Sequence, residues 1–341
     1  MSRNTREKTV GFVGLGMMGG PMAANILKAG HPLVAYDIDH EKNTRIAALG
    51  AQIGSGPADV ASRAQRVVSM VDTTAQAEEV IVGAGGFIEA AQPGDVVISM
   101  STIDPTAVQK MHEKLAARGV DLIDAPVSGM EQGAKLGTLK AFVGGQAPAI
   151  EKAQPVLEAM AAEVIHLGPV GQGLVMKLVN NMLAQVGRIA VIEALVLGAK
   201  AGLDPQTMVD VIGRSTGNSV AFQYTAPRVV SRDFDGIRMD ITYKDLELQT
   251  ALAKSLDVPL FLATICQQIY QMGRAAGLGG EDGAAIVKIY EQMTGVPVAS
   301  TSLRGEQEPS ELSPDLGGIS DPGEMVDLQL AGCATVLSGW R

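Results

Sequence analysis

Three glycines close together are the first residues in the sequence that could bind a ligand. Gly14, Gly16 and Gly19 stand between an apolar run and a segment of helical composition. In that context the first permits a tight turn, the second lets a pyrophosphate approach the backbone, and the third allows close packing of helix against strand. The free N–H groups at the helix N-terminus would then face the phosphates. We therefore expect a dinucleotide to be bound by Gly14, Leu15, Gly16, Met17, Met18 and Gly19.

An acidic residue follows the next apolar run. Asp37 stands roughly 20 residues beyond the glycines, where a carboxylate binds the ribose 2′-hydroxyl of a dinucleotide. The same carboxylate would repel the 2′-phosphate of NADP, and no arginine follows it directly. The sequence therefore favours NAD over NADP as cofactor. A structural turn with an unrelated surface aspartate is the alternative.

A lysine and an asparagine could carry the chemistry. Lys177 and Asn181 are four residues apart in a long apolar segment, and this spacing places them on one helix face. Burial lowers the pKa of a lysine toward the range where it exchanges protons near neutral pH. Such a group takes the hydroxyl proton as a hydride leaves an alcohol and returns it in the reverse direction, and the Asn181 amide can orient the lysine or the hydroxyl. A lysine that merely extends from a helix end into water is the alternative.

Polar residues end two further apolar runs. Ser101-Thr102 ends a strand at the carboxyl edge of the sheet, which is the ligand edge of doubly wound folds. Ser128-Gly129 ends another strand and begins a turn, and a plain strand–turn corner is the alternative interpretation of that pair. The hydroxyl and N–H groups of the second pair suit a substrate carboxylate. Thr102 is expected at the nicotinamide ribose or the substrate, although a helix cap ahead of Asp104 would also explain these hydroxyls.

The elements that must position these residues follow from the apolar pattern. From Thr9 to Gly168, short and almost continuously apolar runs alternate with helical segments, as in parallel strands covered on both faces. The expected strands are Thr9–Leu15, Pro32–Asp37, Arg66–Val71, Asp95–Ser101, Asp121–Pro126, Leu139–Gly144 and Glu163–Leu167. The expected helices between them include Gly20–Ala29, Ala75–Val82, Pro105–Ala117 and Ala147–Ala161.

Beyond Gly168 the strand pattern stops. Helices are expected at Gly171–Gly202, from Asp204-Pro205, and at Val220–Ser231, Ile241–Leu256, Leu260–Ala276 and Asp282–Met293. The fold class is therefore α/β, with an N-terminal Rossmann-type doubly wound sheet followed by an all-α C-terminal domain. The predicted division is a dinucleotide-binding domain over 1–170, a helical substrate and dimerisation domain over 171–298, and a flexible tail over 299–341.

Four ordered segments resemble the β-hydroxyacid dehydrogenase family, which includes 3-hydroxyisobutyrate dehydrogenases and tartronate semialdehyde reductases. The first is Gly16–Ala24 together with Ser101-Thr102. The second is Asp124–Gly129, continuing to Val143-Gly-Gly. The third is Gly171-Gln-Gly173 with Lys177 and Asn180-Asn181, and the fourth is Lys244–Leu246. The likeness spans about residues 9–295. It implies an NAD-dependent oxidoreductase that acts on the CH–OH group of a small 3- or 2-hydroxy acid or on its semialdehyde, with Lys177 as general acid–base.

The resemblance implies further site residues. Met70 and Val71 would line the cofactor with Ser101, Lys244 would lie near the nicotinamide with Asp245 as its partner, and Asn180 would lie beside the substrate.

The sequence departs from the family at one site position. Ser128 and Gly129 match residues that hold the substrate carboxylate, but Met130 stands where the family usually has a second glycine. The Met130 N–H can still donate, while its side chain should fill space near the pocket. This departure puts the transfer of any one family substrate in doubt.

Composition excludes several other classes. A net charge of −10 argues against binding of nucleic acid or of an anionic membrane. Cys266 and Cys333 lack C-x-x-C spacing, so no metal site is expected and a cytoplasmic location fits. Arg188 and Glu193 interrupt the longest apolar stretch, which argues against a membrane span. The apolar helix and the resemblance both favour a homodimer or homotetramer.

Three rival functions remain. A dinucleotide-binding regulatory or scaffold protein without catalysis is the main alternative, since fold alone does not determine activity. Imine reductases share the architecture but usually replace the lysine that stands here at Lys177. A 6-phosphogluconate dehydrogenase-like enzyme would usually carry a histidine beside the pair that is Asn180-Asn181 in this chain.

Overall fold

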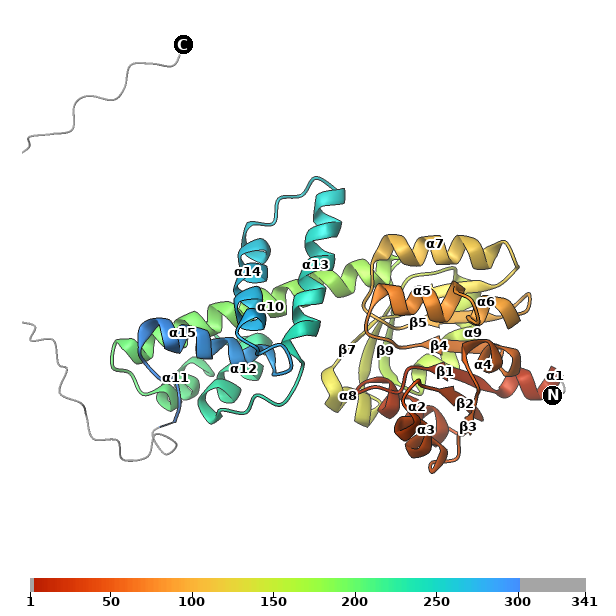
Figure 1. The fold of residues 1–341 in the computed structure, drawn as a ribbon, viewed down its shortest axis with the longest axis horizontal. Helices are drawn as coiled ribbons and strands as arrows, with labels where there is room; N and C mark the ends of the chain where they lie inside the picture. Colours follow the sequence, from red (N-terminus) through yellow and green to blue (C-terminus); the bar gives the residue numbers. More distant parts are fainter. Residues whose placement is uncertain (1–2, 301–341) are drawn as a thin grey trace, which may run out of the picture. The chain divides into compact units, whose positions relative to one another are not determined.

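A parallel sheet organises the N-terminal half of the chain. The structure, a computed structural model, describes residues 3–300 (Figure 1). Its larger sheet has six strands in the order β3-β2-β1-β4-β5-β6. These are β1 Val10–Val13, β2 Leu33–Tyr36, β3 Gln52–Ile53, β4 Arg66–Ser69, β5 Val96–Ser99 and β6 Asp121–Asp124. The strand order reverses between β1 and β4, and a crevice for ligands lies outside the carboxyl ends of strands at such a point.

Both faces of this sheet are buried. Phe12, Val68 and Ile98 belong to one apolar cluster, and their neighbours Val13 and Val67 belong to another. Successive strand residues point to opposite faces, so the almost continuous apolar runs have the pattern that two covering helix layers require. The helices of this half are α1 Arg3–Lys8, α2 Gly19–Lys28, α3 His40–Ala47, α4 Pro57–Arg63, α5 Thr74–Val82, α6 Phe87–Ala90, α7 Pro105–Ala116, α8 Met130–Leu136 and α9 Ala147–Glu158.

The last two expected strands do not extend the large sheet. Strand β8 (Leu139–Val143) pairs with β9 (Ala161–His166) in parallel and with β7 (Val127–Ser128) in antiparallel orientation. Only Ala161 of β9 is buried, because β9 is an edge strand of this small sheet. The expectation that every run is covered on both faces is therefore wrong for β9.

Helices form the rest of the described chain, close to the expected bounds. They are α10 Gln172–Lys200, α11 Pro205–Ile212, α12 Val220–Ser231, α13 Met239–Ser255, α14 Phe261–Ala275 and α15 Val287–Thr294, with a 3₁₀ turn at Gly283–Ile286. The Asp204 carboxylate caps α11 by accepting from Thr207 N–H at 2.8 Å. Ala299 is buried and the N–H of Ser300 donates to Val230 O, so the predicted tail is packed at its start; its remainder, 301–341, lies outside the described residues.

Helix α10 links the two halves. Leu174 packs in a core of the sheet domain, whereas Ile189 and Ile192 pack in the helical core. By length and composition alone α10 is the one helix within residues 3–300 that could cross a membrane. Its exposed side also carries apolar residues, since Leu183 and Leu197 are about 70% exposed.

Candidate active site

The glycine turn has the shape that a phosphate-binding turn needs. Gly14 adopts φ +96°, and a Cβ there would overlap the Met70 carbonyl oxygen. A Cβ at Gly19 would overlap the Gly14 carbonyl, so the first and third glycines are required by close packing. Space around Gly16 is open, and no side chain caps the start of α2. The N–H groups at this helix end are therefore accessible to an anion.

Asp37 is held against this turn. Its Oδ2 accepts from Leu15 N–H at 2.6 Å and its Oδ1 accepts from Asp39 N–H at 2.9 Å. The Asn43 amide fixes the Asp37 backbone from both sides, at 2.8 and 2.7 Å. The buried carboxylate therefore has a fixed position beside the glycine turn.

The loops after β4 and β5 are joined to each other. The N–H of Val71 donates to the buried Ser101 hydroxyl at 2.8 Å, so this serine connects the two loops. The residue that caps α7 is Asp104, which accepts from Thr106 N–H at 2.8 Å. The alternative that Ser101 or Thr102 caps α7 is therefore wrong. Thr102 lies at the edge of the sheet and does not cap this helix.

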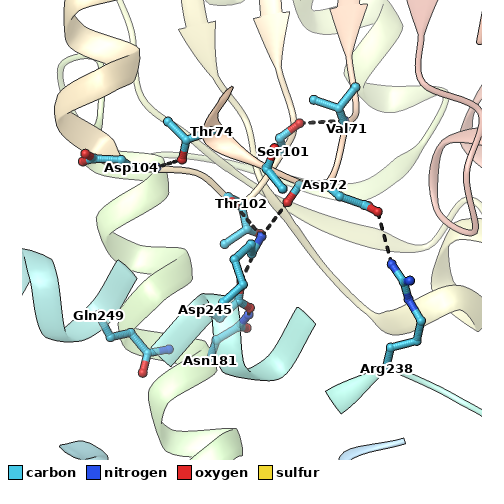
Figure 2. Close-up of polar contacts among 12 residues, drawn as sticks. Val71, Asp72, Thr74, Ser101, Thr102, Asp104, Asn181, Arg238, Asp245 and Gln249 are labelled. Atoms are coloured by element: carbon cyan, nitrogen blue, oxygen red, sulfur yellow. Dashed lines mark hydrogen bonds and ion pairs between the residues drawn. The ribbon is translucent and has the colours of Figure 1, made fainter. Parts of the chain in front are cut away.

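Helix α13 contacts the same loops through a lysine. Lys244 Nζ donates to the carbonyl oxygens of Thr102 at 2.7 Å and Asp72 at 3.0 Å, and lies 3.2 Å from the Asp245 carboxylate (Figure 2). Arg238 adds an ion pair to Asp72 at 3.2 Å. The expected pairing of Lys244 with Asp245 is confirmed, and these contacts connect the helical half to the strand ends.

Lys177 and Asn181 lie beside this cluster on α10. Asn181 Nδ2 donates to Asp245 Oδ2 at 2.7 Å, and Asn180 donates to Asn181 Oδ1 at 3.3 Å. Lys177 is half-buried and its ammonium makes no hydrogen bond or ion pair within the described chain. Burial lowers the pKa of Lys177, the Asp245 carboxylate opposes this shift, and the Lys244 charge adds to it. A partly desolvated amine with no protein partner is suited to exchange a proton with a ligand.

Two buried amides that sequence reasoning missed extend this network. Gln249 Nε2 donates to Gln185 Oε1 at 2.8 Å, and Gln185 Nε2 lies 3.5 Å from Asp245 Oδ2. Both glutamines are buried. Their signal was present in the sequence, since Gln185 follows Asn181 by four residues and Gln249 follows Asp245 by four.

Asp124 fixes the start of α10, a role that sequence reasoning also missed. Its two carboxylate oxygens accept from the N–H groups of Gly171 at 2.7 Å and Leu174 at 2.8 Å. Burial raises the pKa of Asp124 to about 6, although these N–H groups oppose the shift. A Cβ at Gly173 would overlap the Phe142 carbonyl and crowd Asp124. The Gly171-Gln-Gly173 motif therefore allows the helix to approach this carboxylate, less than two turns before Lys177.

Ser128, Gly129 and Met130 lie where β7 ends and α8 begins. Ser128 ends β7 partly exposed, Gly129 has φ +135°, and Met130 has φ +57° with 43% of its surface exposed. Met130 thus holds a left-handed conformation that favours glycine. Within residues 3–300, no hydrogen bond joins these residues to Lys177.

Comparison with known proteins agrees with this arrangement. The family described as the NAD binding domain of 6-phosphogluconate dehydrogenase matches residues 9–168. The family described as NAD-binding of NADP-dependent 3-hydroxyisobutyrate dehydrogenase matches residues 171–290. The fold and site thus define an oxidoreductase with an NAD(P)-binding domain.

Individual relatives indicate the type of oxidoreductase. The chain is 40% identical over 292 residues to 2-(hydroxymethyl)glutarate dehydrogenase of Eubacterium barkeri, covering 85% of this chain and 97% of that protein. It is 37% identical to L-threonate dehydrogenase of Cupriavidus necator with the same coverage. The crystal structure of 3-hydroxyisobutyrate dehydrogenase from Salmonella typhimurium superposes with a TM-score of 0.74 at 32% identity, covering 82% of this chain and 99% of that one. The chain belongs to the β-hydroxyacid dehydrogenase family and is a hydroxyacid dehydrogenase.

Proposed function

We propose that the chain transfers a hydride between NAD(H) and a small hydroxy acid or its semialdehyde, with Lys177 as general acid–base. The observation that carries this proposal is the half-buried Lys177 amine, which has a lowered pKa and no protein partner beside Asn181. The nicotinamide, when bound, accepts the hydride from the carbinol carbon or returns it to the carbonyl. Lys177 takes the hydroxyl proton in oxidation and donates it to the carbonyl oxygen in reduction, so charge and protons balance.

The glycine turn and Asp37 fit the dinucleotide. Open space at Gly16 and the uncapped start of α2 suit the pyrophosphate, and the fixed Asp37 carboxylate suits the ribose 2′-hydroxyl. On these grounds NAD is the preferred cofactor. Met70, Val71 and the Ser101 loop would then line the nicotinamide half, with Thr102 and Lys244 at its edge.

A carboxylate on the substrate would bind at Ser128, Gly129 and Met130. The Ser128 hydroxyl and the N–H groups of Gly129 and Met130 can donate to it, while Asn181 and Asn180 orient the reacting hydroxyl. The names of the relatives support this assignment, because 2-(hydroxymethyl)glutarate and L-threonate both bear a carboxylate and a hydroxyl.

We also propose two domains, over 1–170 and 171–298, and a homodimer or homotetramer. Exposed apolar side chains on α10 and α14 support association, notably Leu183, Leu197, Phe261, Leu262 and Ile265. Light scattering on the eluting protein would give the mass in solution, and a monomer at micromolar concentration would contradict this proposal.

The experiment that tests the function compares three proteins. Wild type, Lys177→Ala and the control Lys110→Ala, an exposed lysine on α7, are assayed by NADH absorbance against a panel of small hydroxy acids and semialdehydes. Turnover should fall by about 10²-fold or more in Lys177→Ala only, with NADH binding intact. If wild type binds NADH but turns over no compound of the panel, a binding-only protein is favoured instead.

A further inference from the structure

Two buried amides lie side by side between α10 and α13. Gln249 Nε2 donates to Gln185 Oε1 at 2.8 Å, and only 6% of the Gln185 surface and 4% of the Gln249 surface is exposed. Ile189 and Leu246, on the same two helices, belong to the apolar core of the helical half. Polar side chains in such a core lower stability unless their polar atoms are hydrogen-bonded.

This pair is not fully hydrogen-bonded. Gln249 Oε1 is buried and has no hydrogen-bond partner within residues 3–300. An unpaired buried acceptor costs free energy of folding, whereas two apolar side chains of the same shape would avoid this cost. Stability therefore does not account for the pair, and its position beside the candidate site indicates a functional role.

The order of the hydrogen bonds follows from the Asp245 carboxylate. A carboxylate only accepts, so Gln185 must present its NH₂ group to Asp245 Oδ2, at 3.5 Å, and its oxygen to Gln249. The NH₂ group of Gln249 occupies that oxygen and keeps Gln185 from turning it toward the carboxylate. Gln249 thus acts on Asp245 only through Gln185 (Figure 2).

Asp245 has partners on two sides. On the α10 side, Asn181 Nδ2 donates to its Oδ2 at 2.7 Å and Gln185 adds the longer contact. On the other side, its Oδ1 lies 3.2 Å from the ammonium of Lys244 on its own helix. The amides therefore draw the carboxylate toward the face of α10 that carries Lys177, four residues before Asn181.

We propose that Gln185 and Gln249 are positioning residues that hold the Asp245 carboxylate toward the proposed general acid–base. Gln185 holds it directly, and Gln249 acts by keeping the Gln185 amide in its donating rotation. The inference rests on the proposed role of Lys177.

The position of this carboxylate affects the protonation of Lys177. Burial lowers the pKa of the Lys177 amine, Asp245 opposes this shift, and Lys244 adds to it. The other charged groups of the cluster, Asp72 and Arg238, pair with each other at 3.2 Å. A carboxylate released from α10 turns toward Lys244, so the Lys177 amine is neutral more often at a given pH.

Competitive labelling measures this effect without substrate or cofactor. Trace acetic anhydride at about pH 7.5 reacts with neutral amines, and peptide mass spectrometry gives the labelling rate of Lys177 relative to the exposed Lys110 of the same molecule. Gln185→Met removes the amide with little change in size and should raise this relative rate by about 3-fold. Gln249→Met should raise it less, and the double variant should match Gln185→Met.

Two controls separate positioning from packing. Gln267→Met makes the same substitution at a half-buried glutamine of α14, which accepts from the Thr250 hydroxyl at 3.4 Å outside this network. It should leave the relative rate within about 1.5-fold of wild type. Gln185→Met in an Asp245→Asn background should also change the rate by less than about 1.5-fold, because the carboxylate through which the amide acts is gone.

An unchanged or lower Lys177 rate in Gln185→Met would overturn the inference. So would an increase that persists in the Asp245→Asn background or that Gln267→Met reproduces, and so would a double variant that exceeds Gln185→Met. A chain that turns over no substrate still gives these rates, so failure of the proposed reaction is distinguishable from failure of the positioning. If the rate rises while the pH dependence of kcat/KM stays unchanged, the positioning holds and the proposed proton transfer by Lys177 fails.

Discussion

The amide nitrogen of Asn181 donates to Asp245 Oδ2 at 2.7 Å and joins α10 to α13. The same carboxylate lies 3.2 Å from Lys244, whose ammonium holds the loops after β4 and β5. Asp245 therefore connects three of the residues expected from sequence to act on substrate or cofactor, because its charge also acts on Lys177.

Replacing Asp245 by Asn should shift the pH dependence of the reaction to lower pH. The carboxylate raises the pKa of Lys177 against the lowering by burial, so its removal lowers that pKa further. In the proposed alcohol oxidation the neutral Lys177 amine would be the base, so activity would rise as pH rises through this pKa. The rising limb of kcat/KM should therefore move to lower pH in Asp245→Asn, measured with saturating NAD. An unchanged limb would show that Lys177 is not the group that titrates.

Replacing Asn181 by Leu should destabilise the fold as well as slow catalysis. Asp245 Oδ2 would keep only the long contact from Gln185 at 3.5 Å. Loss of a donor to a buried carboxylate costs about 1–3 kcal/mol in the free energy of unfolding, measured by urea titration. The double variant Asn181→Leu/Asp245→Leu removes both partners and should cost less than the sum of the single changes. Additive costs would mean that the two side chains do not interact in solution.

The sequence predicted the architecture well because its signals are local. Continuous apolar runs locate the strands of a sheet covered on both faces, and the Asp204-Pro205 cap locates the start of α11. The glycine turn, Ser101 and Lys244 were likewise placed by motifs within a few residues. The tertiary contacts that fix these motifs could not be predicted the same way.

The role of Asp124 depends on residues far apart in the chain, whereas the four-residue spacing of Gln185 and Gln249 from Asn181 and Asp245 was present in the sequence. Asp124 accepts from Gly171 and Leu174, about 50 residues later, and no spacing rule connects them. The separation of β7, β8 and β9 from the main sheet could not be predicted for the same reason. The apolar pattern of a strand does not indicate which other strand it pairs with.

Asp124→Asn should reveal the titration of this carboxyl through stability. Its pKa is about 6 in the fold against 3.8 as the ordinary value, so the folded state binds the extra proton between these limits. Wild type should therefore gain stability over the variant as pH falls, by about 1 kcal/mol between pH 7.5 and 5, and lose that gain as pH rises above 6. Urea unfolding at both pH values measures the difference. A constant difference would mean that Asp124 titrates in the folded state as it does in the unfolded chain.

Met130→Gly should relieve backbone strain two residues after Ser128. At φ +57° a side chain costs about 1–2 kcal/mol relative to glycine, while glycine adds about 0.4–1 kcal/mol of entropy to the unfolded chain. With 43% of its surface exposed, the Met130 side chain is more than half buried, and Met130→Gly and Met130→Ala both lose that burial. The free energy of unfolding of Met130→Gly should therefore exceed that of Met130→Ala by up to about 1 kcal/mol.

Met130→Ala is the matched control, because it removes the same side chain but keeps a Cβ in the left-handed conformation. It should be less stable than the glycine variant by up to about 1 kcal/mol. If the Met130 side chain limits the space beside Ser128, both variants should lower KM for hydroxy acids with a larger substituent next to the carboxylate, and the glycine variant should be the more stable of the two. Equal stability of the two variants would show that the left-handed conformation carries no strain, and an unchanged KM in both would remove Met130 from the determinants of specificity.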